Sequence, residues 1–189
     1  MSKIHISFDL DWCPDFMIDD VLKILNKSKI KCTFFITHKS PAIKKIQSLK
    51  HVVGIHPNYL RSSSIKKNLK LTEKILNLVP GAKIIRSHAL HMNTVLLYEI
   101  FKNFPNIKLD LSTLTYKSKF IDNFSYNFIR KKISRMNYNW EDSIAIHDKN
   151  FNWEKIKYFG KSNIYNFHPI HIFYNTYNYN HYLKIKKSS

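Results

Sequence analysis

The sequence has only two cysteines among its 189 residues, Cys13 and Cys32. Two thiols are too few for a disulfide framework, and they do not by themselves complete a structural zinc site. We therefore expect Cys32 to fill the core and Cys13 to lie beside a functional site. The chain also lacks any apolar run approaching the roughly 20 residues of a membrane-spanning helix, which predicts that it has no transmembrane segment.

A secretory signal is also missing from the start of the chain. The first residues read Met-Ser-Lys-Ile-His and pass directly into a strand pattern, without a long apolar stretch or a small-residue cleavage site. The sequence therefore predicts a cytoplasmic protein. Its length suits one domain, and we expect a catalytic domain over residues 1–173 and a Tyr/Asn/Lys-rich tail over residues 174–189.

Acidic residues are scarce, with 13 Asp and Glu against 31 Lys and Arg and a formal net charge of +18. A basic surface can bind nucleic acid by releasing counterions from phosphates. Nucleic-acid binders, however, place arginines and stacking aromatics on one face, whereas the arginines here are sparse and dispersed: Arg61, Arg86, Arg130 and Arg135. We interpret the lysines as a solvated surface that favours an anionic substrate, nucleotide-linked or lipid-linked, and expect no nucleic-acid partner.

Short apolar runs alternate with helical periodicity along most of the chain, which is the rhythm of a parallel α/β fold. Strands are predicted over residues 3–8, 30–36, 52–55, 83–85, 107–111, 143–146 and 163–167. Helices are predicted after Pro14 and over residues 41–49, 65–79 and 94–102. The aromatic-rich stretch 116–140 is ambiguous, and the tail over 174–182 fits either a terminal helix or an irregular cover.

Polar side chains gather directly after the predicted strands. Asp9 and Asp11 follow the first strand, His56 the third, Arg86 the fourth and His168 the last. Loops at the carboxyl ends of parallel strands meet on one rim, where active sites of such folds lie. We therefore expect these side chains to converge.

The pair Asp9 and Asp11 can face the rim together because alternate residues of an extended segment share one side. One carboxylate could bind a metal ion and the other act as a base, although the pair could instead only cap the helix that starts near Asp15. His56 is followed by Pro57, which stops strand pairing and can hold a histidine rigidly.

The segment from Arg86 to His91 carries one arginine and two histidines after a buried strand. Arginine can keep a carboxylate ionised, and a neutral imidazole can bind zinc. His88 is favoured over His91 as a ligand, because His91 could simply lead into the next helix. His168 is placed for proton transfer, whereas His147 and His171 are expected to be structural.

In this order the segments resemble the polysaccharide deacetylases, the carbohydrate esterase family 4 or NodB-homology fold, over nearly the whole chain. Ser7-Phe8-Asp9-Leu10-Asp11 looks like the family's first motif and Gly54-Ile55-His56-Pro57-Asn58 like the end of the second. The variants Arg86-Ser-His and Phe167-His-Pro-Ile-His-Ile look most like the short WbmS-like branch associated with O-antigen biosynthesis. The resemblance implies a parallel (β/α) barrel, which could be incomplete.

The resemblance also implies roles for single residues. Asp9 would be the catalytic base, Asp11 and His56 metal ligands, Arg86 the residue that orients the base, and His168 the general acid. Asp142, within Trp140-Glu141-Asp142, is the candidate that orients His168. Trp12, Asn58 and Tyr59 lie where they could bind substrate, Trp12 and Tyr59 by stacking on a sugar ring.

One departure concerns the second motif, which normally carries another histidine four positions before the one matched to His56, where this chain has Val52. His88 could complete the ligand set, His51 could reach in by a shifted register, or the metal site could be lost. We favour His88, because three protein ligands leave open positions for water and substrate.

The function implied is a metal-dependent hydrolase, with zinc as the expected divalent ion, that removes an acetyl or formyl group from an amino sugar. The sugar could be nucleotide-linked, lipid-linked or part of an oligosaccharide destined for surface polysaccharide. The alternative is a catalytically silent carbohydrate-binding protein on the same fold, which the apparent loss of a ligand at Val52 would favour.

Overall fold

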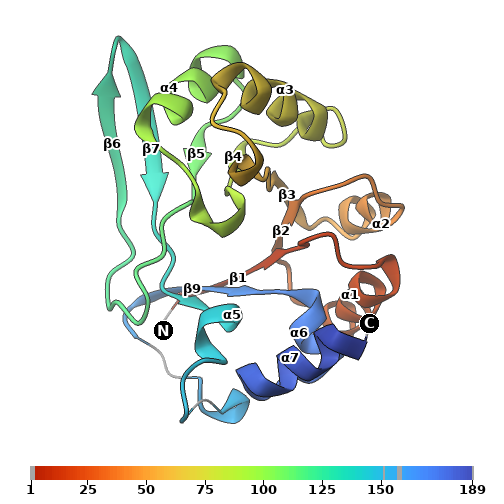
Figure 1. Cartoon of the computed structure of the whole chain (residues 1–189). Helices are drawn as coiled ribbons and strands as arrows, with labels where there is room; N and C mark the ends of the chain where they lie inside the picture. Colours follow the sequence, from red (N-terminus) through yellow and green to blue (C-terminus); the bar gives the residue numbers. More distant parts are fainter. Residues whose placement is uncertain (1–2, 151, 157–158, 189) are drawn as a thin grey trace.

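The structure is a computed structural model that describes residues 3–150, 152–156 and 159–188. Within these residues, strands form a single sheet in the order β6-β7-β5-β4-β3-β2-β1-β9-β8, and every pairing is parallel except the β6–β7 hairpin. The sheet curls into a half-barrel between the edge strands β6 and β8 (Figure 1). This confirms the predicted single-domain α/β fold with an incomplete barrel.

The strands are β1 (Lys3–Asp9), β2 (Thr33–Ile36), β3 (Val52–Ile55), β4 (Ile84–Ile85), β5 (Leu109–Asp110), β6 (Asn123–Phe128), β7 (Lys131–Met136), β8 (Trp140–Glu141) and β9 (Ser162–Phe167). The α-helices are α1 (Asp15–Lys27), α2 (Ala42–Ser48), α3 (Ile65–Leu76), α4 (Thr94–Asn103), α5 (Asp142–Ala145), α6 (Pro169–Phe173) and α7 (Tyr179–Ser188). Short 3₁₀ turns are η1 (Tyr59–Arg61), η2 (His88–Leu90) and η3 (Trp153–Lys155).

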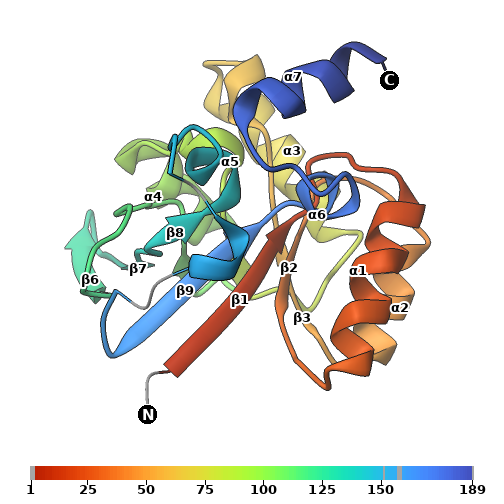
Figure 2. The ribbon, with the colours of Figure 1, turned by 90° about the horizontal axis from the view of Figure 1, so that it is seen from below.

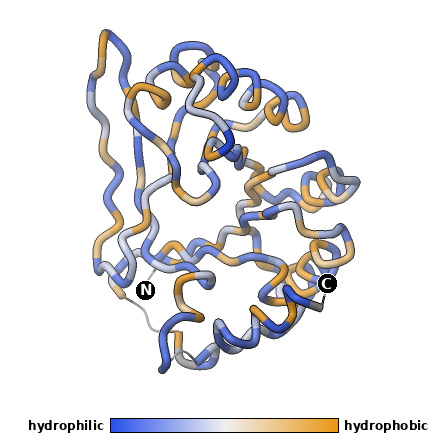
Figure 3. Tube along the Cα trace, viewed as in Figure 1, coloured by the Kyte–Doolittle hydropathy of each residue, from blue (hydrophilic) through white to orange (hydrophobic). Residues whose placement is uncertain are grey.

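Helices α1 and α2 lie side by side outside β1, β2 and β3, while α3 and α4 pack together near β4 (Figures 1 and 2). Each has one apolar face, which buries Met17, Ile18, Val21, Leu22 and Leu25 in α1. Hydrophobic and hydrophilic residues alternate along these helices (Figure 3). Because the apolar faces meet the sheet, the core lies between the helices and strands β1 to β4.

Side-chain caps fix the starts of two helices. The hydroxyl of Ser64 accepts a hydrogen bond from the backbone N–H of Lys67 at the start of α3. The side-chain oxygen of Asn93 accepts one from the backbone N–H of Leu96 at the start of α4. None of the helices in the described part of the chain combines the length and hydropathy that a membrane span requires.

The strand predicted over residues 143–146 is wrong, because this segment belongs to helix α5 and the turn after it. The run Ile144-Ala145-Ile146 is too short to separate strand from helix by periodicity. Asp142 favours the helix, because its carboxylate lies in the first turn and accepts a hydrogen bond from the N–H of Ser143 at 2.7 Å. The ambiguous stretch before it forms the β6–β7 hairpin and β8, and the tail contains α7.

Candidate active site

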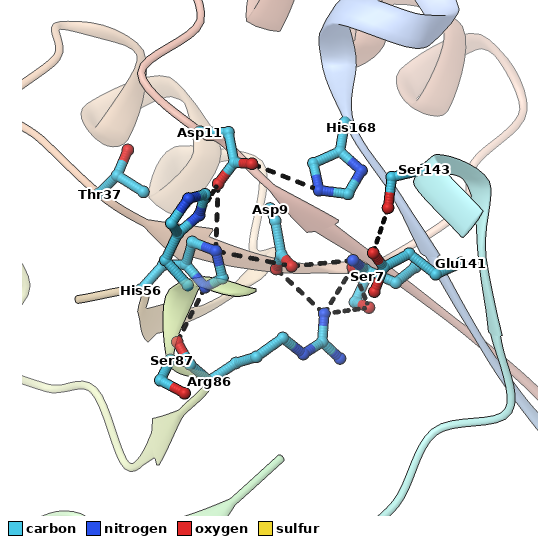
Figure 4. A network of polar contacts seen from close by, with 12 residues as sticks. Ser7, Asp9, Asp11, Thr37, His56, Arg86, Ser87, Glu141, Ser143 and His168 are labelled. Atoms are coloured by element: carbon cyan, nitrogen blue, oxygen red, sulfur yellow. Dashed lines mark hydrogen bonds and ion pairs between the residues drawn. The ribbon is translucent and has the colours of Figure 1, made fainter. Parts of the chain in front are cut away.

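A cavity of about 720 Å³ opens at the carboxyl ends of the central strands. The sequence-predicted residues that line it are Asp9, Asp11, Trp12, His56, His88 and His168. They come from the carboxyl ends of four strands, or from the loops that follow them: β1 supplies Asp9, Asp11 and Trp12, and β3, β4 and β9 supply His56, His88 and His168 in turn. Figure 4 shows Asp9, Asp11, His56 and His168 pointing toward one another, with Arg86 beneath Asp9.

The register between β1 and β9 places three buried polar residues, Ser7, Asp9 and Asn166, next to one another at the floor of the cavity. Ser7 of β1 lies opposite Asn166 of β9 in the parallel ladder. The hydroxyl of Ser7 donates to Asn166 Oδ1 at 2.9 Å, and Asn166 Nδ2 donates to Asp9 Oδ2 at 2.8 Å. Asp9 is therefore held by a neighbouring strand as well as by its own.

Arg86 supplies the charge that balances Asp9. Its Nη1 donates to Asp9 Oδ1 at 3.0 Å and to Ser7 Oγ at 3.1 Å, and it also donates to Asn166 Oδ1. Burial alone would raise the pKa of Asp9, but the adjacent guanidinium and the imidazoles of His56 and His168 lower it below the ordinary value. Asp9 is thus ionised and in a fixed orientation.

The guanidinium of Arg86 is enclosed between two aromatic rings. Its central carbon lies 4.2 Å from the ring centroid of Phe35 and 4.2 Å from that of Tyr138, and the residue is 0% exposed. Among the described residues, no acceptor bonds its Nε or Nη2. Stacking on both faces compensates part of the cost of burying this cation, which a lysine could not match.

Asp11, His56 and His88 form a group that could hold a metal ion, with ligand atoms within 4.8 Å of one another. Asp11 Oδ1 lies 3.1 Å from His56 Nε2 and 3.0 Å from His88 Nδ1. One carboxylate and two imidazoles, with the cavity on the open side, is a donor set typical of catalytic zinc. The structure therefore brings His88 to the position that the sequence favoured.

The hydrogen bonding of His56 fits a cation at this point. Its Nδ1 lies 2.8 Å from the backbone oxygen of Arg86, which can only accept, so Nδ1 carries the proton. In a neutral ring Nε2 then directs a lone pair at the Asp11 carboxylate, and two acceptors face each other. A divalent ion between them would satisfy both.

Charge and backbone geometry also distinguish Asp11. Burial would raise its pKa, but the adjacent imidazoles of His56 and His88 lower it well below the usual range, so Asp11 is ionised. Asp11 and Trp12 both adopt left-handed backbone conformations, with φ of 41° and 58°, and Ala89 and Leu90 beside His88 do the same, at 50° and 56°. Such strain in residues other than glycine clusters at functional sites.

His168, directly after β9, lies beside Asp11 of the metal-ligand group. Its backbone N–H donates to Asp142 Oδ2 at 2.7 Å and its Nδ1 donates to Asp142 Oδ1 at 2.6 Å. Its Nε2 is 3.5 Å from Asp11 Oδ2. Burial would lower the pKa of His168, but Asp142 outweighs it and raises the pKa to about 10, so the ring carries a proton to donate.

Two of the three residues expected to bind substrate are placed elsewhere. Trp12 lines the cavity and is 43% exposed. Tyr59 is 0% exposed and its hydroxyl is bonded to Thr72, so its ring is core and the stacking role is wrong. Asn58 accepts from the N–H of Leu60 and so caps η1, and it does not line the cavity.

The match of Val52 to a missing ligand is also wrong. Val52 begins β3 and His56 follows the end of that strand, so the two side chains are separated by roughly 13 Å along the chain. His51 lies at the same far end, where its Nδ1 accepts from the N–H of Cys32. Neither position can reach the cavity, and the apparent loss at Val52 says nothing about the metal site.

Several residues of the site are not among those predicted from the sequence. Ser7 lies two residues before Asp9 and Asn166 two residues before His168, and this strand alternation indicates that Ser7 and Asn166 face the same network. Glu141 is next to Asp142 but was assigned no role. Tyr138 and the aromatic residues of α7 reach the cavity only through tertiary packing, which no local pattern encodes.

Comparison with known proteins agrees with the geometry. A family model described as WbmS-like polysaccharide deacetylase matches residues 6–186. A solved structure from Bordetella bronchiseptica, described as a polysaccharide deacetylase involved in O-antigen biosynthesis, is 26% identical, with a TM-score of 0.83 over 98% of this chain and 79% of that one. A polysaccharide deacetylase from Bacillus cereus is 13% identical, with a TM-score of 0.55 over 90% and 80%, and shows the fold alone. No curated protein matches the chain.

Proposed function

This chain belongs to the WbmS-like polysaccharide deacetylase family, and we propose that it is a metal-dependent hydrolase that removes an N-acyl group from an amino sugar. The observation that carries the proposal is the arrangement of Asp9 and His168 on either side of the Asp11, His56 and His88 group. A base, an acid and a set of metal ligands thus share one cavity, as amide hydrolysis requires.

We assign the ligands to Asp11, His56 and His88. A bound divalent ion, with zinc expected from the donor set, would polarise the acyl carbonyl and lower the pKa of water toward about 7. Asp9 would accept the proton of the attacking water. Arg86 and Asn166 would keep Asp9 oriented while it does so.

His168 would donate its proton to the departing amine, and Asp142 would hold the ring so that Nε2 faces the cavity. Trp12 would contact the substrate at the mouth. We further propose that residues 1–173 carry these catalytic side chains, that residues 174–189 complete the cavity wall, and that the reaction occurs in the cytoplasm during surface polysaccharide biosynthesis. The likeness to the Bordetella protein supports the pathway class.

The direct test is release of acetate or formate by the full chain with zinc added. Suitable substrates are N-acetylated and N-formylated amino sugars, supplied as nucleoside diphosphate sugars and as short oligosaccharides. Activity that needs the metal and is lost in Asp9→Asn would support the proposal. Tight metal binding without acyl release from any substrate would contradict it, and sugar binding without metal would favour a silent carbohydrate-binding protein.

A further inference from the structure

The cavity has a second wall, which runs from β8 into α5 and continues on α7. Its polar and aromatic members are Glu141, Ser143, His147, Tyr179 and Tyr182. The proposed hydrolysis uses none of them. We propose that this wall is the subsite for the sugar ring of the substrate, in which Glu141 accepts hydrogen bonds from ring hydroxyls and Tyr182 packs against the apolar face of the ring. The inference rests on the proposed function, since it assumes a sugar in this cavity.

Glu141 is a carboxylate prepared to accept further hydrogen bonds. The hydroxyl of Tyr138 donates to its Oε2 and the hydroxyl of Ser143 to its Oε1. Because a carboxylate has about four acceptor sites, each oxygen retains one for a ligand. Burial, followed by the nearby Glu141 charge, raises the pKa of Tyr138, so its hydroxyl keeps the proton that holds Glu141.

Tyr138 also links this carboxylate to the reacting centre. Its ring covers the guanidinium of Arg86, and Arg86 in turn holds Asp9. Figure 4 shows Glu141 and Ser143 beside the Asp9–Arg86 network, on the side of His168. A sugar held by Glu141 would therefore be fixed relative to the catalytic base, which is the positioning that hydrolysis needs.

Tyr182 contributes an aromatic surface whose position is fixed by neighbouring rings. Its centroid lies 4.9 Å from that of His171 in an edge contact, and the ammonium of Lys186 is 6.0 Å away over its ring. The start of α7 is anchored to the α5 segment, because Tyr179 donates its N–H to Ile146 at 3.0 Å and its ring packs on His147. A pyranose could bury its C–H face on this surface.

The charges of the wall select the class of ligand. The chain carries a net charge of +18, yet neither lysine nor arginine is among the described residues that line the cavity. Glu141 matches hydroxyl donors and would repel a phosphate. The part of the ligand that contacts Glu141 is therefore a neutral polyhydroxylated ring.

The test measures binding of methyl glycosides of N-acetylglucosamine, N-acetylgalactosamine and N-acetylmannosamine to the zinc-loaded full chain by saturation-transfer NMR. Glu141→Ala and Tyr182→Ala should each weaken the best ligand at least about tenfold, or about 1.4 kcal/mol. Tyr182→Phe keeps the ring and should bind like the parent. Glu73→Ala removes an exposed carboxylate of α3 outside the cavity and should also bind like the parent.

Singly deoxygenated forms of the best ligand separate a contact from a structural effect. The form that lacks the recognised hydroxyl should bind the parent weakly, and Glu141→Ala should not distinguish it from the complete sugar. If Glu141→Ala does not fold, Tyr182→Ala and the deoxygenated series on the parent decide the question.

Unchanged affinity in both alanine variants, or binding of none of the three glycosides, would overturn the subsite. The outcome is separable from the proposed hydrolysis. Binding that depends on Glu141 and Tyr182 without acyl release would uphold the subsite and contradict the hydrolase. Acyl release with an unchanged KM in Glu141→Ala and Tyr182→Ala would uphold the hydrolase and contradict the subsite.

Discussion

Asp142 binds His168 at two points, its backbone nitrogen and its ring Nδ1, so that the imidazole cannot rotate without breaking a buried, charged hydrogen bond. Both bonds come from one fully buried carboxylate at the start of α5. The single helical turn predicted as a strand is thus the element that positions the proposed general acid.

The first prediction concerns the pH dependence of the reaction. His168 must be protonated to act as an acid, and Asp142 is what raises its pKa to about 10. Asp142→Asn should lower that pKa, so the rate should begin to fall at a lower pH on the alkaline side. At pH 8 we expect a loss of about tenfold to a hundredfold in kcat, since general acids contribute about 10²–10⁴-fold. An unchanged alkaline limb in the pH–rate profile would show that His168 is not the acid.

The second prediction separates the base from the ligand. Asp9→Asn should retain bound zinc and lose deacylation, because Asp9 is held by Arg86 and Asn166 and lies outside the group that could hold the metal. Asp11→Asn should lose zinc together with activity. Elemental analysis of the purified variants measures the difference, and equal zinc content in both would show that the two roles are assigned wrongly.

The third prediction is that His88 completes the ligand set. His88→Ala should weaken zinc affinity sharply, as should His56→Ala, because each removes one of three protein ligands. His51→Ala should leave affinity unchanged, since His51 lies at the far end of β3 and bonds the backbone of Cys32. Zinc titration with a competing chelator distinguishes them. The reverse ranking of His88 and His51 would refute the ligand set.

The fourth prediction tests the buried cation. Arg86→Met should destabilise the metal-free fold by about 3–5 kcal/mol, because the Asp9 carboxylate is left buried without its partner. Adding Asp9→Asn to Arg86→Met should restore part of that loss, since the uncompensated charge is gone. Urea unfolding of the parent, the two single variants and the double variant gives the interaction free energy between Arg86 and Asp9. If the losses of unfolding free energy in the two single variants simply add in the double variant, the aromatic enclosure of Arg86, and not its charge, stabilises the fold.

The fifth prediction concerns close packing in β3. A Cβ at Gly54 would lie 2.7 Å from Ile84 and 2.8 Å from the Phe35 ring that covers Arg86. Gly54→Ala should therefore cost about 1–3 kcal/mol of unfolding free energy. Gly81→Ala is the matched control, because a Cβ there meets nothing within 4 Å. Equal stabilities of the two variants would contradict the packing described.

Much of the architecture follows from local pattern. The helical spacing from Met17 to Leu25 and the proline before it predict α1, and Val52-Val53-Gly54-Ile55 matches β3 residue for residue. The convergence of Asp9, His56 and His168 follows from the rule that parallel strands share a rim. These features depend on neighbours in sequence or on one general property of the fold.

The predictions fail where contacts between residues far apart in the sequence determine the position of a side chain. Tyr59 looks like a rim residue because it follows His56, but its hydroxyl finds Thr72 of α3 and the ring turns into the core. Val52 cannot stand for a ligand because the four positions between it and His56 span the whole of β3, from one end of the sheet to the other. Neither the enclosure of Arg86 by Phe35 and Tyr138 nor the approach of α7 to the cavity has a local signature, since each joins segments far apart in the chain.

The position of α7 has a practical consequence for handling the protein. β1 begins at the opposite end of the molecule from α7 (Figure 2). Tyr179 and Tyr182 of α7 line the cavity. An affinity tag, a fusion partner or a surface linkage attached before β1 would leave the cavity mouth clear. The same attachment after α7 would extend the helix that carries Tyr182. Assays of substrate binding are best made with material tagged at the amino end.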